Sequence, residues 1–234
     1  MPPILTVTGR DVLFAHWPVD PATVESRVPD VFDVETFDGS AWVSALALEN
    51  RGFGPGPIRL PTALERGVPQ LNLRTYVTLD GQSGVYFLSL DADERVAAAV
   101  GWRAFGLPFH RASMRLTRRG DAVTFRSRRE GVPAVFQARY RPTGEAYRAV
   151  PDTVESFCIE HFRYLQPSSE GDGRVWVGEL DREPWTLRPV DATVRRNTLF
   201  EAVDLPTPTA EPVMQYSPGF EMRVMRPVAW PGRD

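Results

Sequence analysis

Three polar side chains, Asn72, Arg74 and Tyr76, stand at alternate positions of segment 71–79. Alternate residues of a β-strand lie on one face, so this strand would present an amide, a guanidinium and a phenol together. Arginine binds a carboxylate through two parallel hydrogen bonds, and Asn and Tyr would orient the rest of the ligand. If the strand lines a barrel, the row predicts a site for a small organic anion. Spacing alone favours the alternative, the solvated face of an ordinary antiparallel strand.

Histidine is the next candidate for chemistry near neutral pH, and the chain has three. His110 follows the helix-breaking sequence Gly106-Leu107-Pro108, where a side chain can project into a cavity and act as a general acid or base. A structural role is the simpler interpretation for each histidine. Their spacing matches no zinc motif, the single cysteine Cys158 cannot build a thiolate site, and no phosphate-binding glycine loop occurs. We therefore expect no metal and no cofactor.

The chain of 234 residues contains no lysine, because all 27 of its basic side chains are arginine. A side-chain amine is required to form a Schiff base with a carbonyl substrate or to hold pyridoxal phosphate. Arginine cannot replace it, since a guanidinium stays protonated at any workable pH. The sequence therefore excludes imine chemistry on a side chain.

Arginines also recur along the predicted strands between residues 112 and 141, and such a basic patch could bind an anion or nucleic acid. However, acidic residues outnumber arginines, the formal net charge is −3, and outward strand faces are commonly charged to keep edges soluble. The sequence favours a solvated face here and no nucleic-acid partner. The arginines concerned are Arg115, Arg126, Arg128, Arg139 and Arg141.

The elements that must position these residues are mostly short strands separated by Gly, Pro and Asp-Gly turns. Strands are predicted at 12–17, 31–36, 41–49, 71–79, 85–90, 112–117, 122–128, 134–141, 175–180, 185–190 and 221–225. Helices are predicted at 22–28, 94–105, 152–165 and 193–203. The fold class is α+β, mostly antiparallel, with a curved sheet or β-barrel and a few peripheral helices. No repeat or linker divides the chain, so we expect a single domain over 1–234.

Composition is that of a water-soluble globular protein, with 42% hydrophobic and 24% charged residues. No apolar run approaches the roughly 20 residues of a membrane span, so we expect no membrane partner. One cysteine fits a reducing compartment, and we expect a cytoplasmic location.

Five sequence segments, in this order along the chain, resemble those of a known family. They are His16-Trp17-Pro18-Val19-Asp20, the segment 36–43, Leu71-Asn72-Leu73-Arg74-Thr75-Tyr76-Val77, the segment 84–92 and Gln215-Tyr216-Ser217-Pro218-Gly219. Together they resemble the uncharacterised family DUF2071, the YqjF-like proteins, over nearly the whole chain. That family is distantly similar to acetoacetate decarboxylase. The resemblance implies a curved, largely antiparallel sheet that closes as a double-barrel-like domain around a small pocket.

The decarboxylase carries its Schiff-base lysine in a segment similar to 101–110 of this chain. Gly106 and Pro108 match that segment, whereas Phe109 stands where the nucleophile should be and His110 replaces a second lysine. The resemblance therefore implies that the pocket is retained but that the protein cannot carry out imine-forming decarboxylation.

Three functions are consistent with these residues. The first is a small-molecule-binding protein in which Arg74 holds a carboxylate or other oxyanion and Tyr76, Phe87 and Phe109 form the walls. The second is a lyase, isomerase or hydratase that uses His110 for non-covalent acid–base chemistry and Arg74 to stabilise an oxyanion. The third is a homo-oligomeric interaction module, because relatives of the decarboxylase fold often form homo-oligomers. The sequence favours the first.

Overall fold

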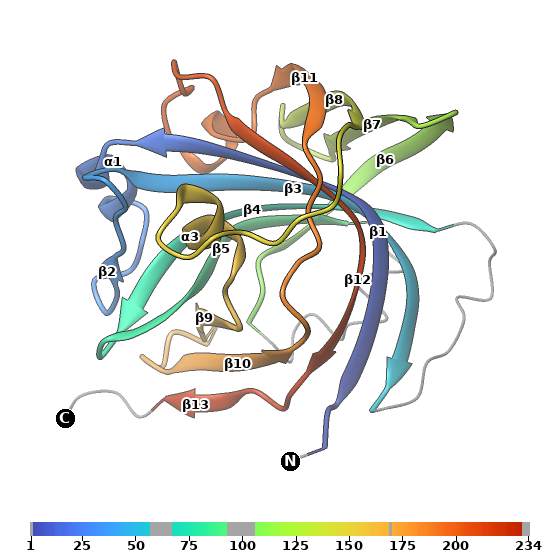
Figure 1. Cartoon of the computed structure of the whole chain (residues 1–234). Helices are drawn as coiled ribbons and strands as arrows, with labels where there is room; N and C mark the ends of the chain where they lie inside the picture. Colours follow the sequence, from blue (N-terminus) through green and yellow to red (C-terminus); the bar gives the residue numbers. More distant parts are fainter. Residues whose placement is uncertain (1, 57–66, 93–105, 169, 231–234) are drawn as a thin grey trace.

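A ring of seven strands forms the centre of the molecule (Figure 1). The computed structural model describes residues 2–56, 67–92, 106–168 and 170–230. Neighbouring strands pair in the order β4-β5-β9-β10-β12-β1-β3, and β3 returns to β4. The bounds are β1 Leu5–Val19, β3 Ala41–Pro55, β4 Val68–Leu79, β5 Gln82–Ala92, β9 Arg163–Pro167, β10 Val175–Asp181 and β12 Val213–Val224.

Strand pairing in the ring is antiparallel except between β5 and β9. The β4–β5 hairpin turns at Asp80 and Gly81, which both have positive φ angles of 50° and 77°. This geometry matches the right-handed twist of the two strands and is the reason for the Asp-Gly preference there. The predicted turn and both predicted strands are confirmed.

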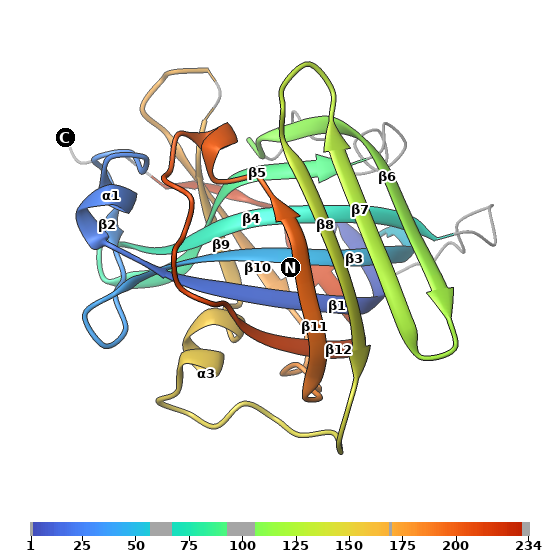
Figure 2. The same ribbon diagram turned by 90° about the horizontal axis from the view of Figure 1, so that it is seen from above.

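A second sheet packs on the outer face of the ring (Figure 2). It contains β6 Phe109–Arg119, β7 Ala122–Arg129, β8 Val135–Pro142 and β11 Val190–Asn197, and β6 joins it to β5 by parallel pairing. The predicted antiparallel meander is therefore confirmed. One core lies between the two layers, where Leu13, Ala45 and Leu73 from the ring meet Phe125 and Phe136. A second core lies inside the ring itself.

The remaining elements are short. They are α1 Pro21–Glu25, capped by the Asp20 side chain, β2 Asp33–Val34, α3 Val154–Ile159, the 3-10 turn η2 Glu201–Val203, and β13 Val228–Trp230, which pairs with β10. No helix in the described ranges is long and apolar enough to cross a membrane. The fold class predicted from the sequence, a mostly antiparallel α+β domain with a curved, ring-closing sheet, is confirmed.

Two predicted helices are wrong. The helix expected over 152–165 ends at Ile159, and the residues after it form β9, because pairing with β10 buries Tyr164 and Leu165. The helix expected over 193–203 is instead β11, which pairs with β8, followed by η2. In both cases pairing with another strand, the next one along the chain for β9 and the distant β8 for β11, overrides a local apolar periodicity. The predicted strand 185–190 forms only isolated bridges at Leu187 and Arg188. The predicted helix 94–105 lies outside the described residues.

Candidate functional site: an interior cavity beside a buried arginine

The polar row of β4 points into the ring. Asn72, Arg74 and Tyr76 are 9%, 8% and 0% exposed. Alternate residues of the same strand, Leu71 and Leu73 among them, pack in the core between the two layers. Strand alternation is therefore confirmed, but the solvated-face interpretation is wrong, because both faces of β4 are covered.

A cavity of about 130 Å³ lies inside the ring, and every strand of the ring contributes to its wall. Most of the wall is apolar, with the aromatic rings of Phe53, Phe87 and Phe109 among it. The other lining residues are Leu5, Val7, Leu48, Asn50, Gln70, Asn72, Leu90, Leu107, Tyr164, Leu180, Phe220, Met222 and Val224. Of the residues predicted from sequence, Asn72, Phe87 and Phe109 line this space.

Three amides form a hydrogen-bonded chain along the cavity wall. Asn50 Nδ2 donates to Gln70 Oε1 at 2.8 Å, and Gln70 Nε2 donates to Asn72 Oδ1 at 2.7 Å. In the described part of the chain, these two bonds do not use the Nδ2 donor of Asn72, and Asn50 Oδ1 is buried without a partner. Tyr164 also lines the cavity, and its hydroxyl is buried with no hydrogen-bond partner within the described ranges. Buried polar atoms are normally satisfied, so such atoms beside a cavity are suited to a ligand.

Arg74 and Tyr76 lie next to the cavity wall along β4, outside the residues that line it. The Arg74 guanidinium donates from Nη2 to the main-chain oxygen of Cys158 at 2.7 Å, and its Nε is buried with no partner among the residues that the structure describes. Within the described ranges, no carboxylate forms an ion pair with Arg74. A buried cation that lacks a counter-charge is costly, and this favours an anion nearby.

A hydrogen-bonded chain continues from Tyr76 across the ring. The Tyr76 hydroxyl lies 2.6 Å from Ser44 Oγ, which lies 2.6 Å from His16 Nδ1. All three side chains are fully buried. Burial, with the nearby charge of Arg74, lowers the pKa of His16 to about 3, so its imidazole is neutral at physiological pH. Burial also raises the pKa of Tyr76, which therefore stays protonated.

The side chains of Phe109 and His110, at the start of β6, lie in different environments. Phe109 lines the cavity, whereas the side chain of the next residue, His110, is exposed, as expected for neighbours on a strand. Partial burial and the charge of Arg129 lower the pKa of His110. The structure thus does not bring His110 together with Asn72 and Phe87.

Three polar residues of the cavity wall, Asn50, Gln70 and Tyr164, were not singled out from the sequence. Gln70 lies two positions before Asn72 on the same strand face, so extending the alternation would have found it. Asn50 and Tyr164 come from β3 and β9, and no local pattern connects them to β4.

Among the described residues we looked for a metal-binding cluster and for a reactive thiolate. No group of three or more His, Cys, Asp or Glu residues in the described part of the chain is arranged to hold a metal ion. Cys158 is buried, and burial raises the pKa of its thiol to about 12, so it is not a thiolate nucleophile at neutral pH.

Comparison with solved structures identifies the fold. The enduracididine biosynthesis enzyme MppR, in complex with pyruvate, matches with a TM-score of 0.68 at 11% identity, over 98% of this chain and 91% of that one. An acetoacetate decarboxylase from Legionella pneumophila matches with a TM-score of 0.63 at 11% identity, over 99% and 88%. At these identities the likeness concerns the fold alone, which is acetoacetate-decarboxylase-like.

Sequence comparison identifies the family. The uncharacterised protein YqjF of Bacillus subtilis (strain 168) is 36% identical over 217 residues, which are 92% of this chain and 87% of YqjF. The sequence profile of DUF2071, described as an uncharacterised conserved protein, matches residues 6–221. The protein therefore belongs to the DUF2071 family and has the fold of acetoacetate decarboxylase.

Proposed function

We propose that the protein binds a small organic carboxylate in the interior cavity without forming a covalent bond to it. One observation carries the proposal: among the described residues, an aromatic-walled cavity with unpartnered polar atoms lies beside the guanidinium of Arg74, which forms an ion pair with no carboxylate there. The absence of lysine from the sequence removes the amine that an imine-forming decarboxylase requires.

The cavity volume limits the ligand. At about 130 Å³, it is close to the roughly 150 Å³ of an engineered cavity that accommodates benzene. A ligand of about six to eight non-hydrogen atoms fits such a space. Pyruvate, the compound bound to the structurally similar MppR, is in this size class.

The polarity of the wall suggests how the ligand is oriented. Phe53, Phe87 and Phe109 would contact its apolar part. Asn72 Nδ2 would donate to a carboxylate oxygen, and a hydroxyl of the ligand would donate to Asn50 Oδ1. Arg74 is two residues beyond Asn72 on the same strand face, so its charge would attract the carboxylate end.

Binding without turnover is favoured over a lyase, isomerase or hydratase. Such an enzyme needs an acid or base at the ligand. Of the described lining residues only Tyr164 is ionisable, and burial raises its pKa, so it remains a hydrogen-bond donor. The exposed side chain of His110 also supports binding alone.

The test uses isobutyrate and its neutral isostere isobutyramide, with pyruvate as a third probe, each titrated by NMR. We expect isobutyrate and pyruvate to bind more tightly than isobutyramide. The variant Arg74→Leu should lose that preference, and Phe109→Trp, which fills the cavity, should lose binding of all three. His110→Ala is the matched control and should bind as the unmodified protein does.

Two results would contradict the proposal. Unchanged isobutyrate affinity in Arg74→Leu would show that the carboxylate does not bind near that residue. Turnover of pyruvate that disappears in His110→Ala, with binding intact, would instead make the protein an enzyme.

A further inference from the structure

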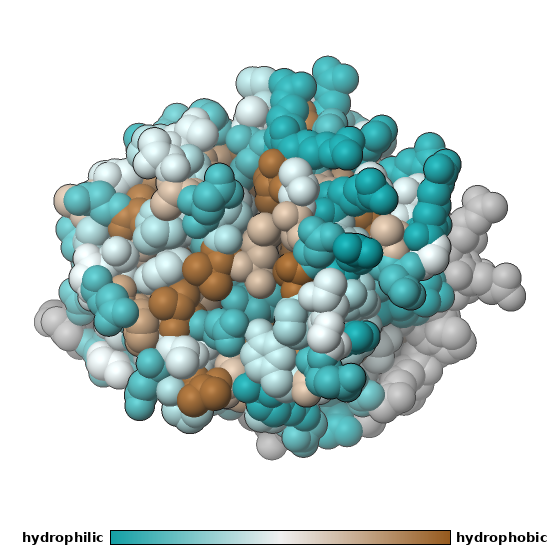
Figure 3. Space-filling view, turned by 45° about the horizontal axis from the view of Figure 1, so that its top comes forward, coloured by the Kyte–Doolittle hydropathy of each residue, from teal (hydrophilic) through white to brown (hydrophobic). Residues whose placement is uncertain are grey.

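Seven exposed arginines cover the outer face of the second sheet. They come from all four of its strands, and inward residues of the same strands, such as Phe125 and Phe136, are fully buried in the core. We call this surface the arginine face. It comprises Arg115 and Arg119 of β6, Arg126 and Arg128 of β7, Arg139 of β8, and Arg195 and Arg196 of β11. Figure 3 shows hydrophilic side chains gathered over this part of the molecule.

The charges of the arginine face are not neutralised by any carboxylate in the described part of the chain. Arginines just beside it have partners: Arg141 lies 2.9 Å from Asp191, and Arg118 binds Asp11 and Glu49. In contrast, none of the seven forms an ion pair with a carboxylate of the residues that the structure describes. Arg115 and Arg126 even stand directly opposite each other on β6 and β7. Like charges in that position destabilise a sheet. The arrangement therefore lowers the stability of the fold, and a role in folding does not account for it.

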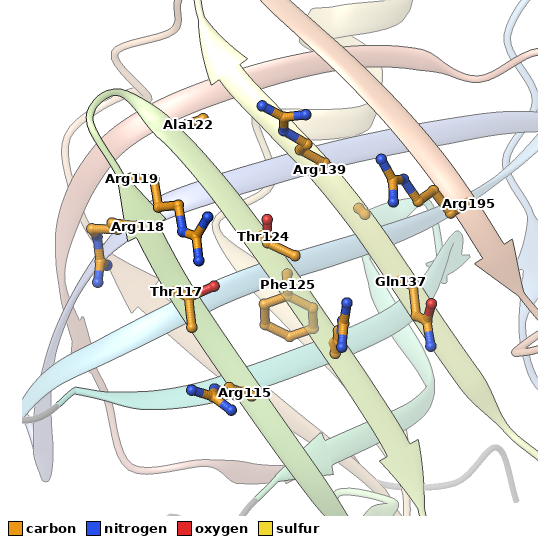
Figure 4. A pocket seen from close by; sticks show the side chains of 12 residues that line it. Arg115, Thr117, Arg118, Arg119, Ala122, Thr124, Phe125, Gln137, Arg139 and Arg195 are labelled. Atoms are coloured by element: carbon orange, nitrogen blue, oxygen red, sulfur yellow. The ribbon is translucent and has the colours of Figure 1, made fainter.

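The side chains surround a hollow rather than spread over a flat surface (Figure 4). Arg115, Arg119, Arg139 and Arg195 border it, and Thr124 lies in its floor. Its volume is about 650 Å³, and a second hollow of about 600 Å³ adjoins it and shares Arg115 and Arg126. No acidic residue of the described chain lines either hollow.

Guanidinium groups in this arrangement suit phosphate. Arginine binds phosphate oxygens through paired hydrogen bonds, and the Thr117 and Thr124 hydroxyls and the Gln137 amide add neutral donors. Several arginines around one hollow can bind several linked phosphates. No exposed aromatic ring lines the two hollows among the described residues, so bases of a single-stranded nucleic acid would find no stacking platform.

We propose that the arginine face binds a short chain of linked phosphate groups, as in tripolyphosphate or the triphosphate of a nucleotide. This site is separate from the interior cavity, because the core between the two sheets lies between them. The proposal therefore does not depend on the carboxylate ligand.

Calorimetry with tripolyphosphate, ATP and orthophosphate at low ionic strength tests the proposal. We expect tripolyphosphate to bind, ATP to bind with similar affinity, and orthophosphate to bind at least tenfold more weakly. The double variant Arg126→Gln/Arg139→Gln should lower the tripolyphosphate affinity about a hundredfold, since each charged hydrogen bond is worth about a factor of ten. Arg223→Gln removes an equally charged, exposed arginine from β12 and should leave the affinity unchanged.

The double variant should not lower the melting temperature, because the two substitutions remove repelling charges from the surface. A loss of affinity in this variant would therefore not result from unfolding. Failure of tripolyphosphate to bind would overturn the proposal, as would an equal loss of affinity in Arg223→Gln. An oligonucleotide that binds with affinity rising with its length, and that tripolyphosphate does not displace, would also overturn it and make the surface a nucleic-acid site.

Discussion

Arg74 and Tyr76 donate hydrogen bonds to the same acceptor, the main-chain oxygen of Cys158 at the end of α3, over 2.7 and 2.6 Å. The two residues stand on one face of β4, so a single carbonyl fastens α3 to the interior of the ring. The Arg74 guanidinium lies 5.6 Å from the centre of the Tyr76 ring. This contact fixes the arginine beside the cavity while leaving its Nε without a partner.

Removal of the Tyr76 hydroxyl should destabilise the fold. Tyr76→Phe leaves the buried Ser44 hydroxyl with one partner fewer, and we expect a loss of about 1–3 kcal/mol in the free energy of unfolding. Urea denaturation measures it. Tyr86→Phe is the control, because the Tyr86 hydroxyl forms no hydrogen bond with the residues that the structure describes, and it should change stability by less than about 0.5 kcal/mol. Equal effects in the two variants would show that the chain from Tyr76 to His16 contributes nothing.

Stability should fall as pH falls below 6.5. The pKa of His16 is about 3 in the folded protein and near 6.5 when unfolded, so between these values only the unfolded chain takes up the proton. Each buried neutral histidine then costs about 1.4 kcal/mol per pH unit. His161, with a pKa lowered by burial to about 4, adds to the effect.

Denaturation at a series of pH values between 6.5 and 5 measures that slope. His16→Gln should reduce it by about one proton's contribution, because the glutamine does not titrate. A slope identical to that of the unmodified protein would mean that His16 accepts a proton in the folded state.

A lysine at position 109 should regain imine chemistry. Phe109 lines the cavity, so the amine of Phe109→Lys would be surrounded by apolar side chains, and desolvation would lower its pKa toward neutrality. We expect borohydride to trap an adduct with acetoacetate, detected by mass spectrometry. The chain contains no other lysine, so the background is limited to the terminal amine.

His110→Lys is the matched control for that experiment. Its side chain would start from an exposed position and keep an ordinary lysine pKa, so it should trap far less. Equal trapping at the two positions would contradict the assignment of Phe109, and not His110, to the cavity.

The buried ion pair between Asp91 and Arg129 should be essential for stability. Arg129 Nε lies 2.7 Å from Asp91 Oδ1, and both side chains are almost fully buried. Asp91→Ala leaves the arginine without a counter-charge, and we expect a loss of about 3–5 kcal/mol. Asp191→Ala breaks the exposed pair with Arg141 and should cost less than about 1 kcal/mol. Chemical denaturation compares them, and similar losses would show that burial is irrelevant to the pair.

Strand alternation in β4 and the turn at Asp80-Gly81 could be predicted because both depend on neighbouring residues. The helices expected over 152–165 and 193–203 could not be excluded in this way. Residues 163–167 pair with β10, beyond the loop that follows them, and residues 190–197 pair with β8, far away in sequence, so the segment expected to be helical contains neither partner. For the same reason Asn50 and Tyr164 could not be identified from the sequence, because they contribute to the cavity wall from strands other than β4.

The sequence by itself determined that imine chemistry is impossible on a side chain, since composition requires no coordinates, and that Asn72, Arg74 and Tyr76 share a face. Only the tertiary structure decided that this face is buried, because strands of the closed ring and α3 cover it. It also decided that Phe109 and not His110 meets the cavity, and that arginines from four strands converge on one surface, where none of them pairs with a carboxylate of the described residues. Burial and convergence are properties of residues brought together by folding, so no single stretch of sequence encodes them.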